Sequence, residues 1–161
     1  KLSELVADAA ASSLPEGQLL HRGGTYLCME GPAFSSRAES ELFRSWGCSV
    51  IGMTNHTEAR LAREAELAYA SLSMVTDYDC WHQDHHAVTV GMVIANLQAN
   101  ASATDPILNQ LMQRLNQERP ESVAHSALAE ALVTSMDQVP AKTRERLDLL
   151  TSPYWGKWDQ P

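Results

Sequence analysis

Apolar and polar positions follow two different periods along the chain, and the alternation of these periods predicts helices and strands in turn. Residues 2–10 carry apolar side chains at helical spacing and predict a first helix. Residues 38–46 repeat the pattern after Ser35 and Ser36, which are both possible N-caps. Between these helices, residues 25–30 (TYLCME) form a short apolar run that is typical of a strand.

The same alternation continues through the second half of the chain. Residues 48–53 (CSVIGM) predict a strand buried on both faces, and residues 68–76 (AYASLSMVT) predict a third strand. Further helices are expected after Thr54 or Asn55, from about residue 89 to 97, through 107–115, and over the alanine-rich residues 122–134. The C-terminal segment that ends in YWGKWDQP shows no clear periodicity.

Helices that alternate with short apolar strands indicate an α/β fold with helical crossovers. Ligands of such sheets bind beyond the carboxyl ends of the strands. The predicted strands end in EGPAFSS, GMTN and TDYDCW, so three polar turns should meet at one edge of the sheet.

Composition narrows the class of protein. The chain has 161 residues, 44% of them apolar, which suits one globular domain. A net charge of -8 argues against nucleic-acid binding, which requires a basic surface. The sequence has neither a bilayer-length apolar run nor a signal peptide. The three cysteines are odd in number and lack a CxxC pair, so we expect reduced thiols and a cytoplasmic protein that does not contact membranes.

The stretch TDYDCWHQDHH, residues 76–86, is the densest in chemical groups. Asp79, His82, Asp84, His85 and His86 could supply nitrogen and oxygen ligands to a divalent metal ion. A polar cluster in a loop is weak support for a metal site, because histidines are common in solvated loops. We therefore expect no bound metal here.

Asp77 and Asp79 in this stretch also form a candidate acid/base pair. At strand spacing both carboxyl groups can lean toward one face, where each raises the pKa of the other. A protonated carboxyl can donate to a ring nitrogen while its ionised partner accepts from an amino group, and an amino-purine presents both edges. The alternative is a capping or solvated DxD pair.

Two residues in the other turns have a similar choice of roles. Phe34 follows a Gly-Pro turn and can stack on a base, although core packing is the commoner role of phenylalanine. Thr54 precedes a predicted helix N-terminus, where a hydroxyl suits either phosphate binding or a plain N-cap. The shared location of these turns favours the binding roles.

Two segments, EGPAFSSRAESELFRSWGCSVIGMT and LAREAELAYASLSMVTDYDCW, carry a family resemblance. They closely resemble the C-terminal half of methylthioadenosine phosphorylases, within the trimeric purine nucleoside phosphorylase family. The resemblance covers residues 1–115 and is densest over 24–101. It implies the C-terminal portion of a purine nucleoside phosphorylase-like mixed sheet flanked by helices. Residues 1–120 would form half of the domain, and residues 121–161 a helical C-terminal extension.

The implied activity is that of a pentosyltransferase in purine and methionine salvage. Methylthioadenosine and phosphate would give adenine and 5-methylthioribose 1-phosphate, without a cofactor. The resemblance assigns a role to each matching residue. Phe34 would pack against the purine, Met53 would lie under the sugar and base, and Thr54 would contact phosphate. Asp77 and Asp79 would bind N7 and the 6-amino group with support from Ser35, and Val90 and Ile94 would surround the alkylthio group.

The side chains favour an adenine nucleoside with a modified sugar. Aspartate accepts the hydrogens of a 6-amino group, whereas a 6-oxo purine would favour an asparagine amide. Val90 is apolar where a ribose hydroxyl would need a polar partner. Other substrates, namely methylthioinosine, adenosine or inosine, remain alternatives, as does a non-catalytic nucleoside-binding fragment.

The sequence departs from the family at several points. Ala33 replaces a larger residue, commonly arginine, and residues 55–58 (NHTE) replace a proline-containing turn. His56 in this turn is a candidate for a local adaptation to the substrate. The family's glycine-rich phosphate loop and its arginine and histidine phosphate ligands belong to an N-terminal half. We expect that half as a separate piece held non-covalently, in a homotrimer or a dimer of trimers.

Overall fold

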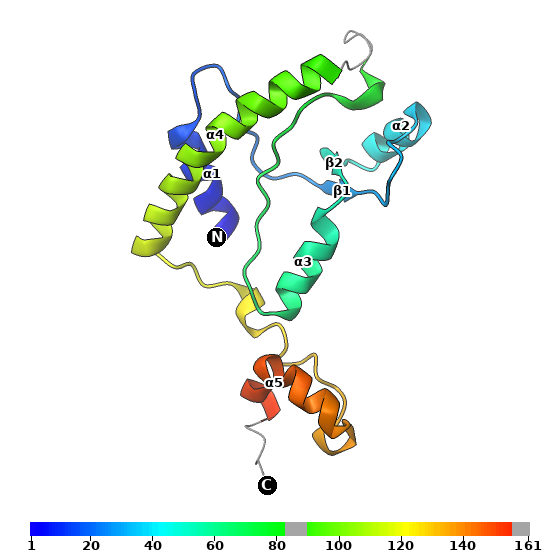
Figure 1. Cartoon of the computed structure of the whole chain (residues 1–161), viewed down its shortest axis with the longest axis vertical. Coiled ribbons are helices and arrows are strands. Elements are labelled where there is room, and N and C mark those ends of the chain that lie inside the picture. Colours follow the sequence, from blue (N-terminus) through cyan, green and yellow to red (C-terminus); the bar gives the residue numbers. More distant parts are fainter. Residues whose placement is uncertain (83–89, 156–161) are drawn as a thin grey trace. The chain divides into compact units, whose positions relative to one another are not determined.

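The computed structural model describes residues 1–82 and 90–155 (Figure 1). Helices and strands alternate up to residue 64, which confirms the predicted α/β order. In chain order, the elements are α1 (Leu2–Ser13), β1 (Tyr26–Cys28), α2 (Arg37–Ser45), β2 (Val50–Gly52), α3 (Asn55–Glu64), the 3-10 turn η1 (Asp79–Trp81), α4 (Val90–Gln117), the 3-10 turns η2 (Val123–Ser126) and η3 (Met136–Gln138), and α5 (Ala141–Trp155).

β1 and β2 pair in parallel, with Leu27 opposite Ile51. Parallel strands need a crossover connection, and α2 provides it. Both strands are half-buried, so the prediction that residues 48–53 are buried on both faces is wrong. The reason is that the sheet has only these two strands in the described part of the chain.

The chain divides into two compact units. The first comprises Lys1–His56 with Ala70–Pro120, and the second Thr57–Tyr69 with Glu121–Pro161. The first unit therefore contains the sheet and the three polar turns that follow the predicted strands. The second contains most of α3 together with the C-terminal segment.

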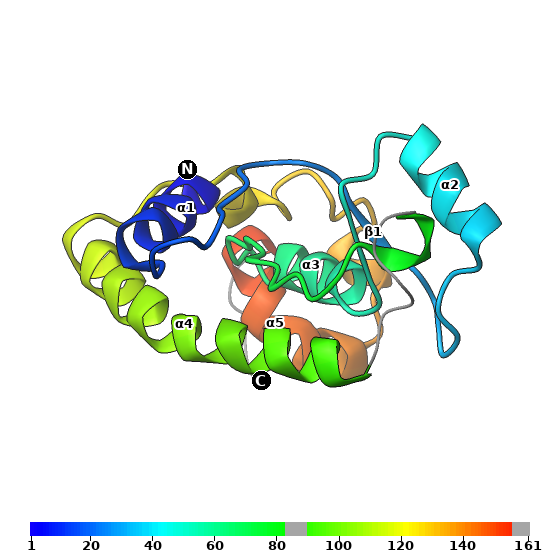
Figure 2. The ribbon, with the colours of Figure 1, turned by 90° about the horizontal axis from the view of Figure 1, so that it is seen from above.

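Apolar packing of α1 on α4 forms the centre of the first unit. Ala10 is fully buried against Ala103 and Ile107, which are 1% and 2% exposed. Both views show α1 beside the C-terminal half of α4 (Figures 1 and 2). The partly buried side chains around this cluster are Leu14, Leu20, Leu72 and Met74.

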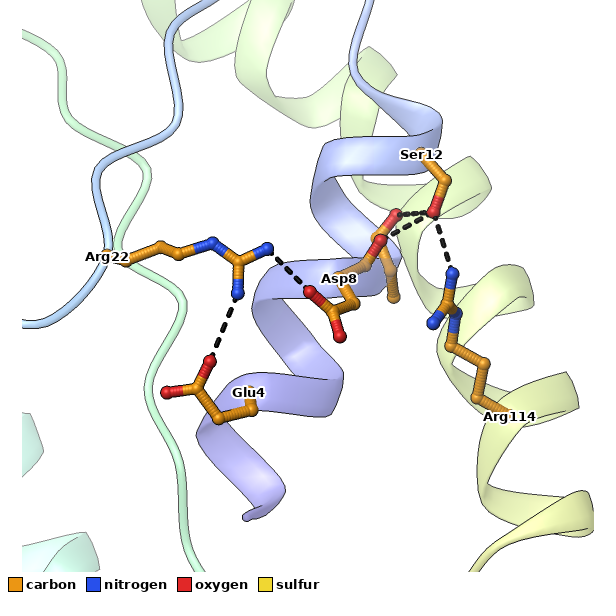
Figure 3. A network of polar contacts seen from close by, with 6 residues as sticks. Glu4, Asp8, Ser12, Arg22 and Arg114 are labelled. Atoms are coloured by element: carbon orange, nitrogen blue, oxygen red, sulfur yellow. Dashed lines mark hydrogen bonds and ion pairs between the residues drawn. The ribbon is translucent and has the colours of Figure 1, made fainter.

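Polar contacts on the exposed side of α1 reinforce this packing (Figure 3). The Arg22 guanidinium donates to Asp8 at 2.5 Å and to Glu4 at 3.1 Å, so the segment that leads to β1 is tied back to the helix. The hydrogen bond with Asp8 is the main cause of a raised pKa of Arg22. Arg114 of α4 donates to the Ser12 hydroxyl at 3.1 Å. Exposed ion pairs of this kind contribute little to stability, because solvent screens them.

Residues 68–76 are not a strand in the described chain, so the third predicted strand is wrong. The segment is held by side-chain amides of α4 instead of by a ladder. Asn96 Nδ2 donates to the Thr76 carbonyl at 2.5 Å, and Asn100 Nδ2 donates to the Val75 carbonyl at 3.0 Å. Because these asparagines are four residues apart on one helical face, they can hold two successive carbonyls.

α4 is one continuous helix, whereas the sequence predicted two. Pro106 lies inside it and cannot donate to the Ser102 carbonyl, a loss that costs about 3 kcal/mol in a helix interior. Ala103 and Ile107, on either side of this proline in the sequence, are buried against α1. This packing explains why the helix continues through the proline.

In the second unit, the structure differs from the sequence analysis at two further segments. Residues 122–134 form the turn η2 and irregular turns instead of an alanine-rich helix. The Leu128 N–H donates to Glu66 Oε1 at 2.9 Å, and so it is diverted from the Ala124 carbonyl that an α-helix would use. The C-terminal segment without periodicity contains the helix α5. Within the described ranges, no helix is sufficiently long and apolar to cross a bilayer.

Candidate functional site

The first polar turn follows β1 and lines an open pocket of about 440 Å³. Gly31 has a φ of 70°, which favours glycine, and a Cβ atom here would lie 3.1 Å from Met53 Sδ. The turn after β1 and the turn after β2 therefore lie in contact. The residues that line the pocket include Met29, Glu30, Gly31, Phe34, Glu39 and Phe43.

A capping box fixes the end of this turn where α2 begins. The Ser36 hydroxyl accepts from the Glu39 N–H, and the Glu39 carboxylate accepts from the Ser36 N–H at 2.7 Å. The Ser36 backbone N–H, followed by its hydroxyl, lowers the pKa of Glu39. Of the two predicted N-caps, Ser36 takes this role.

The segment that carries Asp77 and Asp79 forms a tight turn and not an extended strand. Asp77 Oδ1 accepts from the Asp79 N–H at 2.9 Å, and Asp77 Oδ2 accepts from the Thr76 hydroxyl at 2.8 Å. Asp79 begins η1 with a φ of 61°. The strand spacing assumed from the sequence is therefore wrong, although the two acidic residues remain adjacent through this hydrogen bond.

Contacts with α2 and with its N-terminal turn hold this acidic turn in place. Ser40, which is 2% exposed, donates from its hydroxyl to Asp79 Oδ2 at 2.6 Å. The Cys80 thiol donates to the Ser35 carbonyl at 3.6 Å. The Arg44 guanidinium lies 3.6 Å from the centre of the Trp81 ring, within the range of a cation–π interaction. These contacts and the Gly31–Met53 contact bring the three predicted turns together.

Cys80 acts in this arrangement as a donor and not as a nucleophile. Desolvation is the main cause of a raised pKa of its thiol, and the neighbouring Asp79 carboxylate raises it further. A reactive cysteine needs a lowered pKa so that the thiolate is populated near neutral pH. Cys80 therefore lacks the feature expected of a nucleophilic cysteine.

The structure places the remaining predicted residues around these turns. Phe34 is 87% exposed, which excludes core packing within the described chain. Thr54 is exposed directly before α3, and Val90 and Ile94 are 75% and 48% exposed on the first turns of α4. The Ser35 hydroxyl donates to Met29 Sδ at 3.6 Å. The substrate contacts of all these residues stay predictions.

Only two of the five predicted metal ligands, Asp79 and His82, belong to the described residues. Asp84, His85 and His86 lie outside the described residues. Within residues 1–82 and 90–155, no group of three or more histidine, cysteine or acidic side chains is arranged to hold a metal ion.

Sequence reasoning missed three residues that shape the site, namely Ser40, Asn96 and Asn100. Ser40 is three residues before Phe43 in α2, so it belongs to the apolar side of that helix, and a polar residue there was the available signal. The asparagines gave a weaker signal, a pair at helical spacing on α4. The Ser40 signal shows that a side chain faces inward, but neither signal shows the partner.

Comparisons with known proteins identify the family of this chain. The phosphorylase superfamily matches residues 2–113. An S-methyl-5'-thioadenosine phosphorylase from Prochlorococcus marinus is 57% identical over 99% of this chain and 51% of its own length. Another, from Thermosynechococcus vestitus, is 55% identical over 95% of this chain and 53% of its own length.

Solved structures give the same result. The crystal structure of a methylthioadenosine phosphorylase from an antarctic soil metagenomic library superposes with a TM-score of 0.85 at 43% identity, covering 92% of this chain and 52% of that one. A Schistosoma mansoni methylthioadenosine phosphorylase in complex with adenine gives a TM-score of 0.68 at 26% identity, covering 86% and 53%.

The chain spans about half the length of the relatives that it matches. Over this half, the match includes both strands, α1 to α3 and most of α4. The expected purine nucleoside phosphorylase-like fold class is thereby confirmed. From its sequence and its fold, the chain belongs to the phosphorylase superfamily.

Proposed function

We propose that this chain supplies the purine-binding half of an enzyme that cleaves 5'-methylthioadenosine with phosphate. The observation that carries the proposal is the junction of the acidic turn with α2, where Ser40 donates to Asp79 and Asp79 in turn donates to Asp77. This places two carboxyl groups beside a turn with an exposed phenylalanine. Named relatives at 55–57% identity support the substrate.

In the proposed reaction, a phosphate oxygen attacks C1' of the sugar and forms the new C–O bond. The C1'–N9 bond breaks, and its electron pair goes to the purine. A carboxyl of the Asp77 and Asp79 pair gives a proton to N7 and so neutralises the leaving group, which is general-acid catalysis. The carboxylate regains a proton from hydrogen phosphate or solvent, and the products are adenine and 5-methylthioribose 1-phosphate.

The other predicted residues have positioning roles in this proposal. Phe34 packs on the purine, Met53 lies under the sugar and base, and Thr54 contacts phosphate at the start of α3. Val90 and Ile94 surround the methylthio group. The exposure of Phe34, Val90 and Ile94 in the described chain supports these roles, because a side chain reserved for a ligand need not pack in the core. Thr54 is exposed as well. Ser35 supports the aspartates from the turn before α2, and no cofactor takes part.

The proposed enzyme also needs a second half, equivalent to the remaining length of the relatives, to supply further phosphate ligands. Large apolar side chains that would be covered by such a partner are exposed in the first unit, among them Trp46, Val75 and Val90. We propose that the assembly is a homotrimer or a dimer of trimers. Sedimentation of the natural full-length protein tests this point.

The activity is tested by incubating the natural full-length protein or complex with methylthioadenosine, with and without phosphate. Adenine release that requires phosphate supports the proposal. Release without phosphate would indicate a hydrolase, and faster cleavage of methylthioinosine, adenosine or inosine would indicate a different nucleoside phosphorylase. Binding without turnover would indicate a nucleoside-binding protein, and each of these three results contradicts the proposal.

A further inference from the structure

Ser40 differs from other helical hydroxyl groups in this chain. Ser45 donates to the Leu42 carbonyl at 2.7 Å, and Thr151 donates to the Leu147 carbonyl at 3.0 Å, so both bond within their own helices. Such local bonds are the usual outcome for serine and threonine inside helices. The Ser40 hydroxyl instead donates to Asp79, which lies 39 residues away in the sequence.

Burial makes this contact a constraint on both partners. Ser40 is 2% exposed, and a buried hydroxyl without a partner is costly. The carboxylate oxygen satisfies it at 2.6 Å, a short distance that is typical of a hydroxyl bound to a charged acceptor. As the donor is on the rigid helix α2, it fixes the position of Asp79 Oδ2 and thus the rotation of the whole carboxyl group.

The constraint continues from Asp79 to Asp77. Asp79 has a φ of 61°, a conformation that is uncommon for residues other than glycine, and its N–H donates to Asp77 Oδ1 at 2.9 Å. The Thr76 hydroxyl holds the second oxygen of Asp77. The orientation of both carboxyl groups therefore depends on a series of hydrogen bonds that begins at Ser40.

We propose that Ser40 is a positioning residue that determines the preference for 6-amino over 6-oxo purines. This rests on the proposed function. A 6-amino group donates hydrogens and needs a correctly aimed carboxylate oxygen, whereas a 6-oxo group offers only an acceptor. Without the hydroxyl, the Asp79 carboxyl can rotate, and the aligned acceptor that discriminates between the two purines is lost.

The test compares methylthioadenosine with methylthioinosine as substrates of the natural full-length protein and of the variant Ser40→Ala. We expect kcat/KM for methylthioadenosine to fall about tenfold, since misplaced catalytic groups cost one to two orders of magnitude. The value for methylthioinosine should change much less, so the ratio of the two should also fall about tenfold. Ser45→Ala is the matched control, because it removes a hydroxyl of the same helix that is bonded only to Leu42.

Two additional variants keep the test decisive. Ser40→Cys retains the shape of the side chain but is a weak donor, so it should reproduce the lower ratio even if Ser40→Ala folds poorly. In an Asp79→Asn background, Ser40→Ala should cause little further loss, because its effect passes through Asp79. A ratio equal to that of Ser45→Ala, or an equal loss for both substrates, would overturn the positioning role.

The outcome for Ser40 can be separated from the outcome for the proposed function. If the unaltered protein releases no adenine with phosphate, the proposed function fails. The Ser40–Asp79 contact is then tested by thermal unfolding of Ser40→Ala, Asp79→Asn and the double variant. Coupled losses would support the contact, and additive losses would overturn it.

Discussion

Each of the two units of this chain is stabilised internally by a different kind of interaction. In the first, α1 and α4 meet through buried apolar side chains at Ala10, Ala103 and Ile107. In the second, one acidic residue, Glu66, accepts hydrogen bonds from the Leu128 N–H and the Tyr154 hydroxyl. Apolar packing is insensitive to pH, whereas a carboxylate acceptor is not. The packing of α1 on α4 should therefore persist under acidic conditions that weaken the Glu66 contacts of the second unit.

The largest expected effect is on the stability of the first unit. Ile107→Ala removes a side chain that is 2% exposed, and a buried Ile→Ala change costs about 2–5 kcal/mol. Hydrogen exchange of the full-length protein should show lower protection of α4 amides and little change at the Leu128 amide. Leu149→Ala is the matched control, since Leu149 is 89% exposed. Equal losses of protection in both units would contradict the separation.

The next largest effect is on turnover. Asp77→Asn removes the ability of this side chain both to give and to accept the proton at N7. We expect kcat/KM for methylthioadenosine to fall more than about tenfold, within the range that general-acid groups contribute. Asp137→Asn, at η3 in the second unit, is the control. Near-normal activity of Asp77→Asn would remove Asp77 from the proposed mechanism.

The asparagines of α4 should have a smaller effect that also belongs to the first unit. Asn100→Leu leaves the Val75 carbonyl without its 3.0 Å donor, and the net loss of one such hydrogen bond is about 1 kcal/mol. We expect kcat/KM to fall about fivefold, because the segment that leads to Asp77 is less well held. Gln98→Leu, on the same helix, should leave kcat/KM unchanged. An effect of Gln98→Leu as large as that of Asn100→Leu would count against the role of the α4 amides.

The smallest expected effect is the pH response of the second unit. The Tyr154 hydroxyl and the Leu128 N–H lower the pKa of Glu66 below its ordinary value of 4.5. The contribution of Glu66 to stability is therefore present above pH 4.5 and lost as the pH falls through the lower folded-state pKa. Glu66 raises the pKa of Tyr154 above 10.0, so that contribution is present below pH 10.0 and lost as the pH rises through the higher folded-state pKa.

Hydrogen exchange at the Leu128 amide measures this response directly. Protection should decrease in acid in the unaltered protein and depend less on pH in Glu66→Gln, which cannot be protonated. Tyr154→Phe should lose the response at high pH while keeping part of the response in acid. An acid response in Glu66→Gln equal to that of the unaltered protein would contradict the assignment.

The sequence predicted the elements that depend on local signals. Ser36, one of the two predicted N-caps, lies at the start of α2, and the runs around β1 and β2 are short and apolar. The errors occur where distant partners compete with local preference. Asn100 takes the Val75 carbonyl from 25 residues away, and Glu66 takes the Leu128 N–H from 62 residues away.

At the candidate site too, local features were predicted from the sequence and a contact between distant residues was not. The two acidic residues and the three turns were located from residue type and position, but the hydrogen bond that links α2 to the acidic turn was not. Ser40 and Asp79 are 39 residues apart, and nothing in the local pattern of either residue names the other. Sequence reasoning can therefore locate the groups of a site more readily than their orientation.

The most direct test of the account is the preference of the protein for adenine over hypoxanthine, measured by calorimetry on the natural full-length protein without turnover. The account predicts tighter binding of adenine, because the Asp77 and Asp79 carboxyl groups can accept from a 6-amino group, and loss of this preference in Asp77→Asn. Equal affinity for the two bases in the unaltered protein would contradict the claim that this acidic turn recognises the purine.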